Sequence, residues 1–316
     1  MEPVKSITIT RIFDAPRQLV FEAWIDEKHL QQWWMPRGFT NPTCRITASS
    51  RPGYAETGAE LTVVTYHPAF GDMPQSGKFE EVSPFDKIIF STTAFPNAEG
   101  KPQLRGRNVI VFSDEPAQGK AKTRMVITAS ILEAGPGLEG ALAGMDQGWA
   151  ETLDRLSEHV EDTSEREMLI TRVVDAPRDL VWKIWTEPEH VKEWWGPNGF
   201  TNTIHKFDLV PGGEWSLTMH GPDGADYPNQ IRFIEIIRSE RLVYDHGQPE
   251  DGGSFRTFVH FSDEGGKTRV TMKGVFKTAE YRQLLIDKYG ALEGQQQHIA
   301  RMEDYLKQFK NGEVRK

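Results

Sequence analysis

The chain has 316 residues, with 37 basic and 46 acidic side chains and a formal net charge of −9. This length is typical of two domains. The acidic balance argues against nucleic acid as a partner, because phosphate binding needs a basic face. The single cysteine, Cys44, excludes an intrachain disulfide and a cysteine-rich zinc module. No apolar run approaches about 18 residues and the N-terminus lacks a signal-peptide pattern, so we expect no membrane span and a cytoplasmic location.

The first predicted elements are a strand and two short helices. A strand is expected over 6–13, and Asp14 is expected to cap the helix that follows, with Pro16 in its first turn. A second short helix ends at the pair Trp33-Trp34, where Pro36 stops it. We expect one tryptophan of this pair to anchor the helix to the rest of the domain, because buried aromatic rings chiefly supply packing area.

This segment is repeated later in the chain. Residues 9–41 match residues 170–202 at an offset of 161 with no gap, and 18 of the 33 positions are identical. The repeat predicts a second strand over 168–174, a cap at Asp175 and a tryptophan pair at Trp194-Trp195. A period this long indicates one domain duplicated rather than a solenoid. We therefore predict domains at 1–162 and 168–316, joined by a linker at 163–167.

Strand-like runs and a long helix complete each copy. The closing helix of the first copy repeats apolar residues every three or four positions from Leu142 to Val160. An antiparallel sheet with this helix packed on one face, an α+β fold, accounts for the order. The predicted strands lie between Gly, Pro and Asp turns, at 87–92, 108–112, 124–129, 241–244, 256–261 and 269–273.

The motifs resemble those of a known superfamily. The runs 14–17 and 33–36, their equivalents at 175–178 and 194–197, and the runs 212–215 and 266–270 are similar to the helix-grip proteins that include START and Bet v 1-like domains. Within that superfamily they most resemble the Hsp90-ATPase-activator-homologue type domain. The resemblance implies two tandem domains, each a curved antiparallel sheet wrapped around a long C-terminal helix. It also implies apolar-ligand cavities and, in some members, cyclase activity.

The resemblance also suggests an Hsp90-type chaperone as a partner to be considered. The eukaryotic namesake of the family carries a further N-terminal domain that contacts the chaperone. The first copy of this chain begins almost at Met1. We therefore expect no Hsp90 activation, and a small apolar ligand as the partner.

Aromatic and methionine side chains are the candidates to line such a cavity. They sit on the predicted strands, the tryptophan pairs and the closing helices, although strand parity is not fixed by the sequence. The predicted lining residues are Trp34, Phe79, Met125, Met145 and Trp149 in the first copy, and Trp195, Trp215, Phe233, Tyr244, His260, Met272, Gln295 and His298 in the second.

The second cavity is expected to be the more polar one. Gln295, His298 and Met302 share one face of the closing helix at helical spacing. Aligning the runs 140–144 and 290–294 places Met145 and Trp149 opposite Gln295 and Ile299, so the first helix is more apolar there. The alternative is that Gln295 and His298 face water. We treat the equivalent pair His29 and His190 as structural residues of an exposed helix.

No motif assigns a cofactor, a metal or a catalytic residue. Dinucleotide, P-loop, nucleophile-elbow and zinc-protease patterns are absent, and no His or Cys spacing suits a metal. We therefore predict a small-molecule binding protein for lipid, aromatic or polyketide-like ligands rather than an enzyme. A cyclase or hydratase with an acid–base pair in the second cavity, and a co-chaperone-like interaction module with an open apolar patch, are the alternatives.

Overall fold

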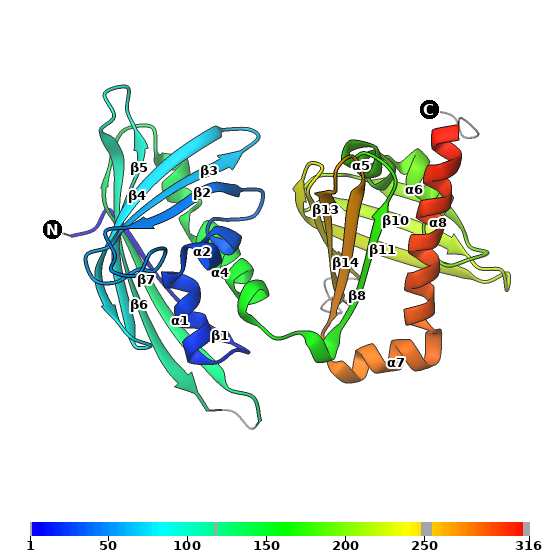
Figure 1. Cartoon of the computed structure of the whole chain (residues 1–316), viewed down its shortest axis with the longest axis horizontal. Helices are drawn as coiled ribbons and strands as arrows, with labels where there is room; N and C mark the ends of the chain where they lie inside the picture. Colours follow the sequence, from blue (N-terminus) through cyan, green and yellow to red (C-terminus); the bar gives the residue numbers. More distant parts are fainter. Residues whose placement is uncertain (1, 117–118, 248–254, 312–316) are drawn as a thin grey trace. The chain divides into compact units, whose positions relative to one another are not determined.

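The computed structural model describes residues 2–116, 119–247 and 255–311 (Figure 1). The chain divides after Asp162 into two compact units, each with its own sheet and core. Ser164–Arg166 form a 3₁₀ helix, and the first strand of the second unit begins at Glu167. The fold is α+β with two tandem domains, as the sequence predicts.

Over its described range, the first domain has a strand, two short helices, six further strands, a third short helix and a long helix. Among its described residues, the strands form one seven-stranded antiparallel sheet in the order β1-β7-β6-β5-β4-β3-β2. The long helix α4 contacts β1, α1 and α2. The elements are β1 (Lys5–Phe13), α1 (Arg17–Ile25), α2 (Glu27–Trp33), β2 (Thr40–Thr47), β3 (Glu60–His67), β4 (Gly71–Ser83), β5 (Lys87–Pro96), β6 (Pro102–Glu115), β7 (Lys122–Ala134), α3 (Glu139–Ala143) and α4 (Met145–Val160).

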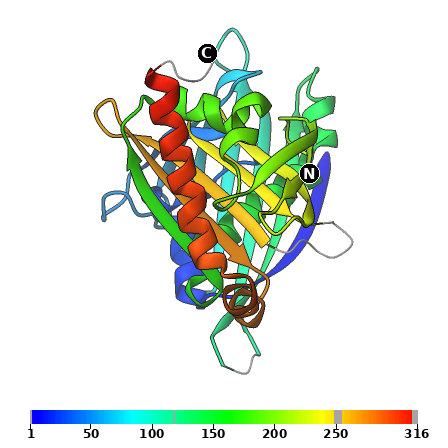
Figure 2. The ribbon, with the colours of Figure 1, turned by 90° about the vertical axis from the view of Figure 1, so that its right-hand side faces the viewer.

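The second domain repeats this order. Its strands, within the ranges that the structure describes, form a seven-stranded antiparallel sheet in the order β8-β14-β13-β12-β11-β10-β9. Figure 2 shows α8, in red, lying across this sheet, and the inner face of α8 joins the core. The elements are β8 (Glu167–Val174), α5 (Arg178–Thr186), α6 (Pro188–Trp194), β9 (Thr201–Phe207), β10 (Glu214–His220), β11 (Asp226–Ile237), β12 (Arg241–His246), β13 (Phe255–Asp263), β14 (Thr268–Phe276), α7 (Ala279–Tyr289) and α8 (Ala291–Asn311).

The predicted helix caps are wrong. Pro16 and Pro177, rather than the two aspartates, occupy the cap positions, and no side chain caps either helix. Asp14 lies two residues before the cap, so its carboxylate pairs with Lys122 at 2.5 Å. Asp175 likewise pairs with Lys310 at 3.1 Å. Both aspartates fasten the helix entrance to another element instead of to the helix itself.

Strand register shows which residues of the two sheets are equivalent. The same bulge interrupts each sheet one residue after a buried phenylalanine, Phe79 in the first and Phe233 in the second. Phe79 pairs with Phe90, whereas Phe233 pairs with Tyr244. The phenylalanine of β5 is therefore replaced by a tyrosine in β12. By the same register, Leu61 of β3 is equivalent to Trp215 of β10.

An arginine on each long helix sets the register of that helix. Arg155 donates to the backbone oxygens of Gln32, Met35, Pro36 and Phe39 at 3.0–3.2 Å. Arg301 donates to the equivalent oxygens of Glu193, Gly196, Pro197 and Phe200, and to that of Trp195, at 2.7–3.2 Å. The two guanidinium groups thus make the same clamp. Thr152 is therefore equivalent to His298, and Trp149 to Gln295.

This clamp corrects the alignment that the sequence suggested. The run 140–144 precedes α4, whereas 290–294 includes the first turn of α8. Met145 and Ala291 each begin their helix, so the predicted match of Met145 with Gln295 is four residues, about one helical turn, out of register. The predicted match of Trp149 with Ile299 is wrong for the same reason. The similar glycine-containing runs 140–144 and 290–294 therefore occupy different structural positions in the two copies.

Candidate functional site

Most of the predicted lining residues are buried beneath the two sheets. In the first domain Trp34, Phe79 and Met125 are buried, and Met145 and Trp149 are half-buried. In the second domain Met272 and Gln295 are half-buried. The remaining members of the second domain, apart from His260, are buried: Trp195, Trp215, Phe233, Tyr244 and His298.

The prediction that His260 lines the cavity is wrong. Side chains alternate between the two faces of a strand, and on β13 Val259 and Phe261 belong to the core. His260 therefore points to the opposite face, where it is exposed. Phe258, two residues earlier in the chain, lies on the same outer face but is buried. The cations of Arg241 and Lys273 cover it, at 5.7 and 5.4 Å from its ring centre.

Besides its chain neighbour Trp194, whose ring centre lies at 5.6 Å, four rings of the second domain surround the indole of Trp195. The ring centres of Trp215 and His298 lie 4.4 and 4.5 Å from that of Trp195. Those of Trp185 and Tyr244 lie at 6.2 and 6.4 Å. We call these five residues, which come from α5, the end of α6, β10, β12 and α8, the Trp195 cluster.

Four members of the Trp195 cluster carry buried polar atoms with no hydrogen-bond partner among the described residues. They are Nε1 of Trp185, Nε1 of Trp215, Oη of Tyr244 and Nε2 of His298. Leaving such a group unpaired in the interior costs about 1–3 kcal/mol, and most buried polar groups in proteins are paired. The four unpartnered atoms of this cluster thus gather around one ring.

The protonation of His298 follows from its contacts. The backbone N–H of Gly196 donates to Nδ1 of His298 at 3.0 Å. Burial, with smaller effects from the positive charge of Arg301 and from His246, lowers the pKa of His298 to about 3. The imidazole is therefore neutral near pH 7, and because Nδ1 accepts, the proton is on Nε2. His298 presents an N–H donor to the interior.

Tyr244 is held neutral as well. Its side chain is 1% exposed, and burial raises the pKa of the phenol above its ordinary value. Thr257 stands directly opposite on β13, and its hydroxyl offsets part of this rise through its side-chain interaction with the phenol. Next to Tyr244 on the same face of β12, His246 stacks on Phe255 with ring centres 4.1 Å apart. Burial lowers the pKa of His246 to about 4. His298, Tyr244 and His246 are therefore uncharged near neutral pH.

The equivalent place in the first domain carries fewer polar groups. Phe90 and Leu61 stand where the second domain has Tyr244 and Trp215, and Thr152, at the position of His298, donates its hydroxyl to the backbone oxygen of Gly148 at 2.7 Å. Trp149 fills the space instead. Its ring centre lies 6.4 Å from that of Trp24, in a stacked arrangement, and 6.1 Å from that of Trp34. The indole nitrogens of Trp24 and Trp34 lack partners among the described residues.

A second contact ties the short helices to the long ones in both domains. Nδ1 of His29 lies 2.7 Å from Nε2 of His159, and Nδ1 of His190 lies 2.8 Å from Oη of Tyr305. His190 is 4% exposed, so the expectation of an exposed helix is wrong for this residue. Its hydrogen bond across the domain interior gives it the structural role that the sequence suggested.

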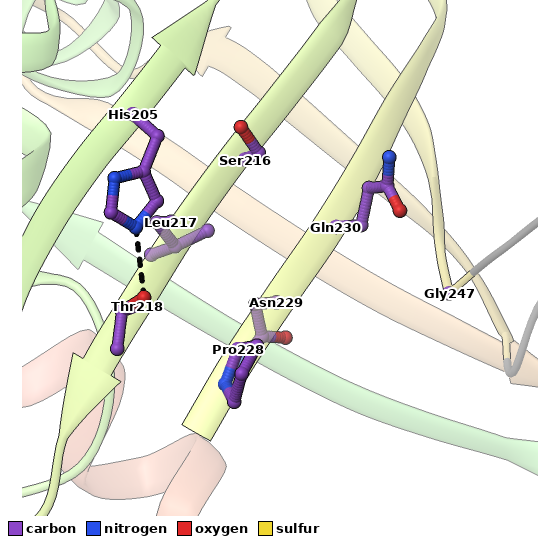
Figure 3. A pocket seen from close by; sticks show the side chains of 8 residues that line it. All are labelled: His205, Ser216, Leu217, Thr218, Pro228, Asn229, Gln230 and Gly247. Atoms are coloured by element: carbon purple, nitrogen blue, oxygen red, sulfur yellow. Dashed lines mark hydrogen bonds between the residues drawn. The ribbon is translucent and has the colours of Figure 1, made fainter. Parts of the chain in front are cut away.

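A shallow pocket of about 470 Å³ lies on the outer face of the second sheet (Figure 3). His205, Ser216, Thr218 and Gln230 line it from β9, β10 and β11. Three of these side chains already have partners: Nε2 of His205 lies 2.8 Å from the Thr218 hydroxyl, and Gln230 donates to Glu214 at 2.8 Å. Sequence reasoning missed this pocket, although the alternation of Trp215 and Leu217 with Ser216 and Thr218 marks its polar face.

Two other chemistries find no support in the geometry. Cys44 is buried, and burial raises the pKa of its thiol to about 12, so it does not supply a thiolate. Within the described ranges, no three His, Cys, Asp or Glu side chains come together as metal ligands. No described helix combines the length and the hydropathy that crossing a membrane requires.

The two antiparallel sheets, each packed against a long C-terminal helix, define a tandem helix-grip protein. A family model described as "Activator of Hsp90 ATPase homolog 1-like protein" matches residues 14–161 and again 175–307. The chain belongs to this family in both of its halves, as its motifs predicted.

Solved structures resemble the chain either over one domain or over both. A crystal structure of a protein from Nitrosomonas europaea is 28% identical, with 47% of this chain and 98% of that chain covered and a TM-score of 0.42. A solution structure of a protein from Arthrobacter aurescens is 25% identical, with 47% and 90% covered and a TM-score of 0.43. The di-domain ARO/CYC StfQ from the steffimycin biosynthetic pathway is 14% identical, with 96% and 99% covered and a TM-score of 0.48. Comparison with curated proteins gives no match.

Proposed function

We propose that the second domain binds a small, largely apolar molecule between its sheet and α8, at the Trp195 cluster. The observation that carries the proposal is the set of buried polar atoms on Trp185, Trp215, Tyr244 and His298 that have no partner among the described residues. A bound molecule supplies those partners, and aromatic walls with a few fixed polar groups are typical of small-molecule sites.

The proposal assigns no ligand site of this kind to the first domain. Trp149 occupies the corresponding interior, and Phe90 and Leu61 give it no polar group to match. We propose that this domain does not bind the same molecule. The duplication would then leave one ligand site per chain.

Binding is favoured over acid–base turnover by the state of the two titratable groups. The pKa of His298 is lowered to about 3, so at pH 7 it is a poor base. Burial raises the pKa of Tyr244, so its phenolate does not form at that pH. Neither group is poised near neutral pH, where acid–base catalysts operate most efficiently.

The test is native mass spectrometry of the purified chain, followed by denaturing extraction of any retained molecule. We expect an adduct of one molecule per chain that is lost from His298→Thr and Tyr244→Phe, which carry the residues of the first domain. Trp149→Gln, which places the residue of the second domain in the first, should retain it.

Two outcomes contradict the proposal. An adduct that survives both second-domain substitutions would place the ligand elsewhere. The absence of any adduct, together with no thermal shift across fatty acids, aromatic compounds and polyketides, would overturn ligand binding and favour an interaction module.

A further inference from the structure

We infer that the molecule bound by the second domain presents an uncharged carbonyl oxygen, of the ketone or ester kind, to the Trp195 cluster. This inference rests on the proposed function and specifies the chemical class of its ligand. It depends on three features: the kind of hydrogen bond each unpartnered atom can make, the absence of an available cation, and the contrast with the first domain.

The unpartnered atoms of the Trp195 cluster are hydrogen-bond donors. Indole nitrogens only donate, which settles Trp185 and Trp215. Nε2 of His298 carries the imidazole proton because Nδ1 already accepts from the Gly196 N–H at 3.0 Å. The hydroxyl of Tyr244 both donates and accepts. The cluster therefore offers up to four donors, and Tyr244 is its one group able to accept, so a complementary ligand group is an acceptor.

The charge of the site selects an uncharged acceptor. Arg301, three residues after His298 on α8, holds the nearest cation along that helix. Its guanidinium is engaged with five backbone oxygens at 2.7–3.2 Å. A carboxylate at the cluster would be taken out of water without a free countercharge, which costs far more than burying a carbonyl that receives hydrogen bonds.

The first domain shows that the donors are not required by the fold. Three of the positions carry Phe90, Leu61 and Thr152, and the Thr152 hydroxyl is satisfied within its own helix. The buried acceptor Oδ1 of Asn202 also lacks a described partner, but Asn41 has the same unpartnered atom at the equivalent position. The Asn202 amide is fixed by the backbone oxygens of Lys192 and Trp195. The donors of Trp215, Tyr244 and His298, unlike this acceptor, are specific to the second domain, whereas the unpartnered indole nitrogen of Trp185 recurs in Trp24 of the first domain.

The experiment compares probes that share one carbon skeleton. Fluorene has no polar group, 9-fluorenone adds a carbonyl, 9-fluorenol adds a hydroxyl, and fluorene-9-carboxylate adds an anion. Equilibrium dialysis against the full chain measures their dissociation constants. We expect 9-fluorenone to bind about tenfold tighter than fluorene, which is the effect of one or two added hydrogen bonds. We expect the carboxylate to bind weakest.

Variants assign the preference to the cluster. His298→Thr should reduce the advantage of 9-fluorenone over fluorene by about fivefold while leaving fluorene binding nearly unchanged. Tyr244→Phe should reduce it through a second position, which keeps the test valid if either variant folds poorly. His260→Thr removes an exposed histidine from the opposite face of the sheet and should change neither constant.

A spectroscopic readout reports the hydrogen bonds directly. The carbonyl stretching frequency of bound 9-fluorenone should lie below its value in an apolar solvent, and His298→Thr should return it toward that value. Equal binding of fluorene and 9-fluorenone would overturn the carbonyl inference and leave ligand binding intact. Tighter binding of the carboxylate would replace it with an anion site. If none of the probes binds and no ligand is retained by the purified chain, the proposed function itself fails.

Discussion

The two domains keep the same frame around different interiors. In both, an arginine on the long helix clamps the backbone after the second short helix, and a histidine of that short helix bonds to the long helix. Inside, Phe90 and Thr152 of the first domain are replaced by Tyr244 and His298. The residues that hold the fold are thus separate from those that differ between the two interiors.

The largest effect is expected from removing the clamp. Arg155→Ala and Arg301→Ala each leave at least four backbone oxygens without their donor, so each domain should lose about 2–4 kcal/mol of unfolding free energy. Hydrogen exchange measured by mass spectrometry can follow each domain separately. Each substitution should weaken protection in its own domain only. Equal losses of protection in both domains would show that the clamp is not a local feature.

Removing the Trp149 side chain from the first domain should reduce stability more than removing the Gln295 side chain from the second. Trp149→Ala removes a ring that contacts Trp24 and Trp34, and should cost about 2 kcal/mol because part of the ring is exposed. Gln295→Ala, at the equivalent position, should cost less than about 0.5 kcal/mol. Denaturant unfolding of the two variants checks the difference. Similar losses would mean that the two interiors are filled alike.

Acid should destabilise the second domain more than the first. The pKa of His298 is lowered to about 3, against an ordinary value of 6.5, by burial and by Arg301. Between those values the unfolded chain binds more protons than the folded chain, so stability falls as the pH falls from about 6.5 toward 3. His246 adds to the same slope with a pKa of about 4.

Calorimetry at a series of pH values tests this expectation. His298→Thr should flatten the decline in the melting temperature between pH 6.5 and 4. His190, His260 and, in the first domain, His159 also have lowered pKa values and supply a residual slope. The nearest charged and titratable groups, Arg301, His246 and Tyr244, remain in the variant. An unchanged slope would show that His298 is not buried in its neutral form.

The smallest effect is expected at the helix entrances. Asp14→Ala and Asp175→Ala break solvent-exposed ion pairs with Lys122 and Lys310, and such pairs contribute little. The unfolding midpoint should scarcely move in either domain. A clear loss of helix α1 or α5 in the variants, measured by hydrogen exchange, would restore the capping role that the sequence suggested.

The sequence predicted more of the fold than of the candidate site. Hydrophobic spacing and the repeat located the first strand, the two short helices, three later strands and the long helix of each copy, and pointed to a polar face at Gln295 and His298. They did not locate strands β2–β4 and β9–β11 or helices α3 and α7. The sequence could not show which face of the sheet each residue of β13 occupies. Phe258 is buried by Arg241 and Lys273 on the outer face, so the strand is apolar on both sides. The proton position on His298 depends on Gly196, 102 residues away in the chain, which no local pattern reveals.

The arginine clamp also bears on how a duplicated gene diverges. Because Arg155 and Arg301 anchor the long helices to the backbone rather than to other side chains, substitutions elsewhere on the same helices need not shift their register. Threonine could become histidine, and tryptophan glutamine, without a compensating change in the frame. The two copies can then differ at these interior positions while they keep one frame, and each chain carries both interiors in a fixed ratio.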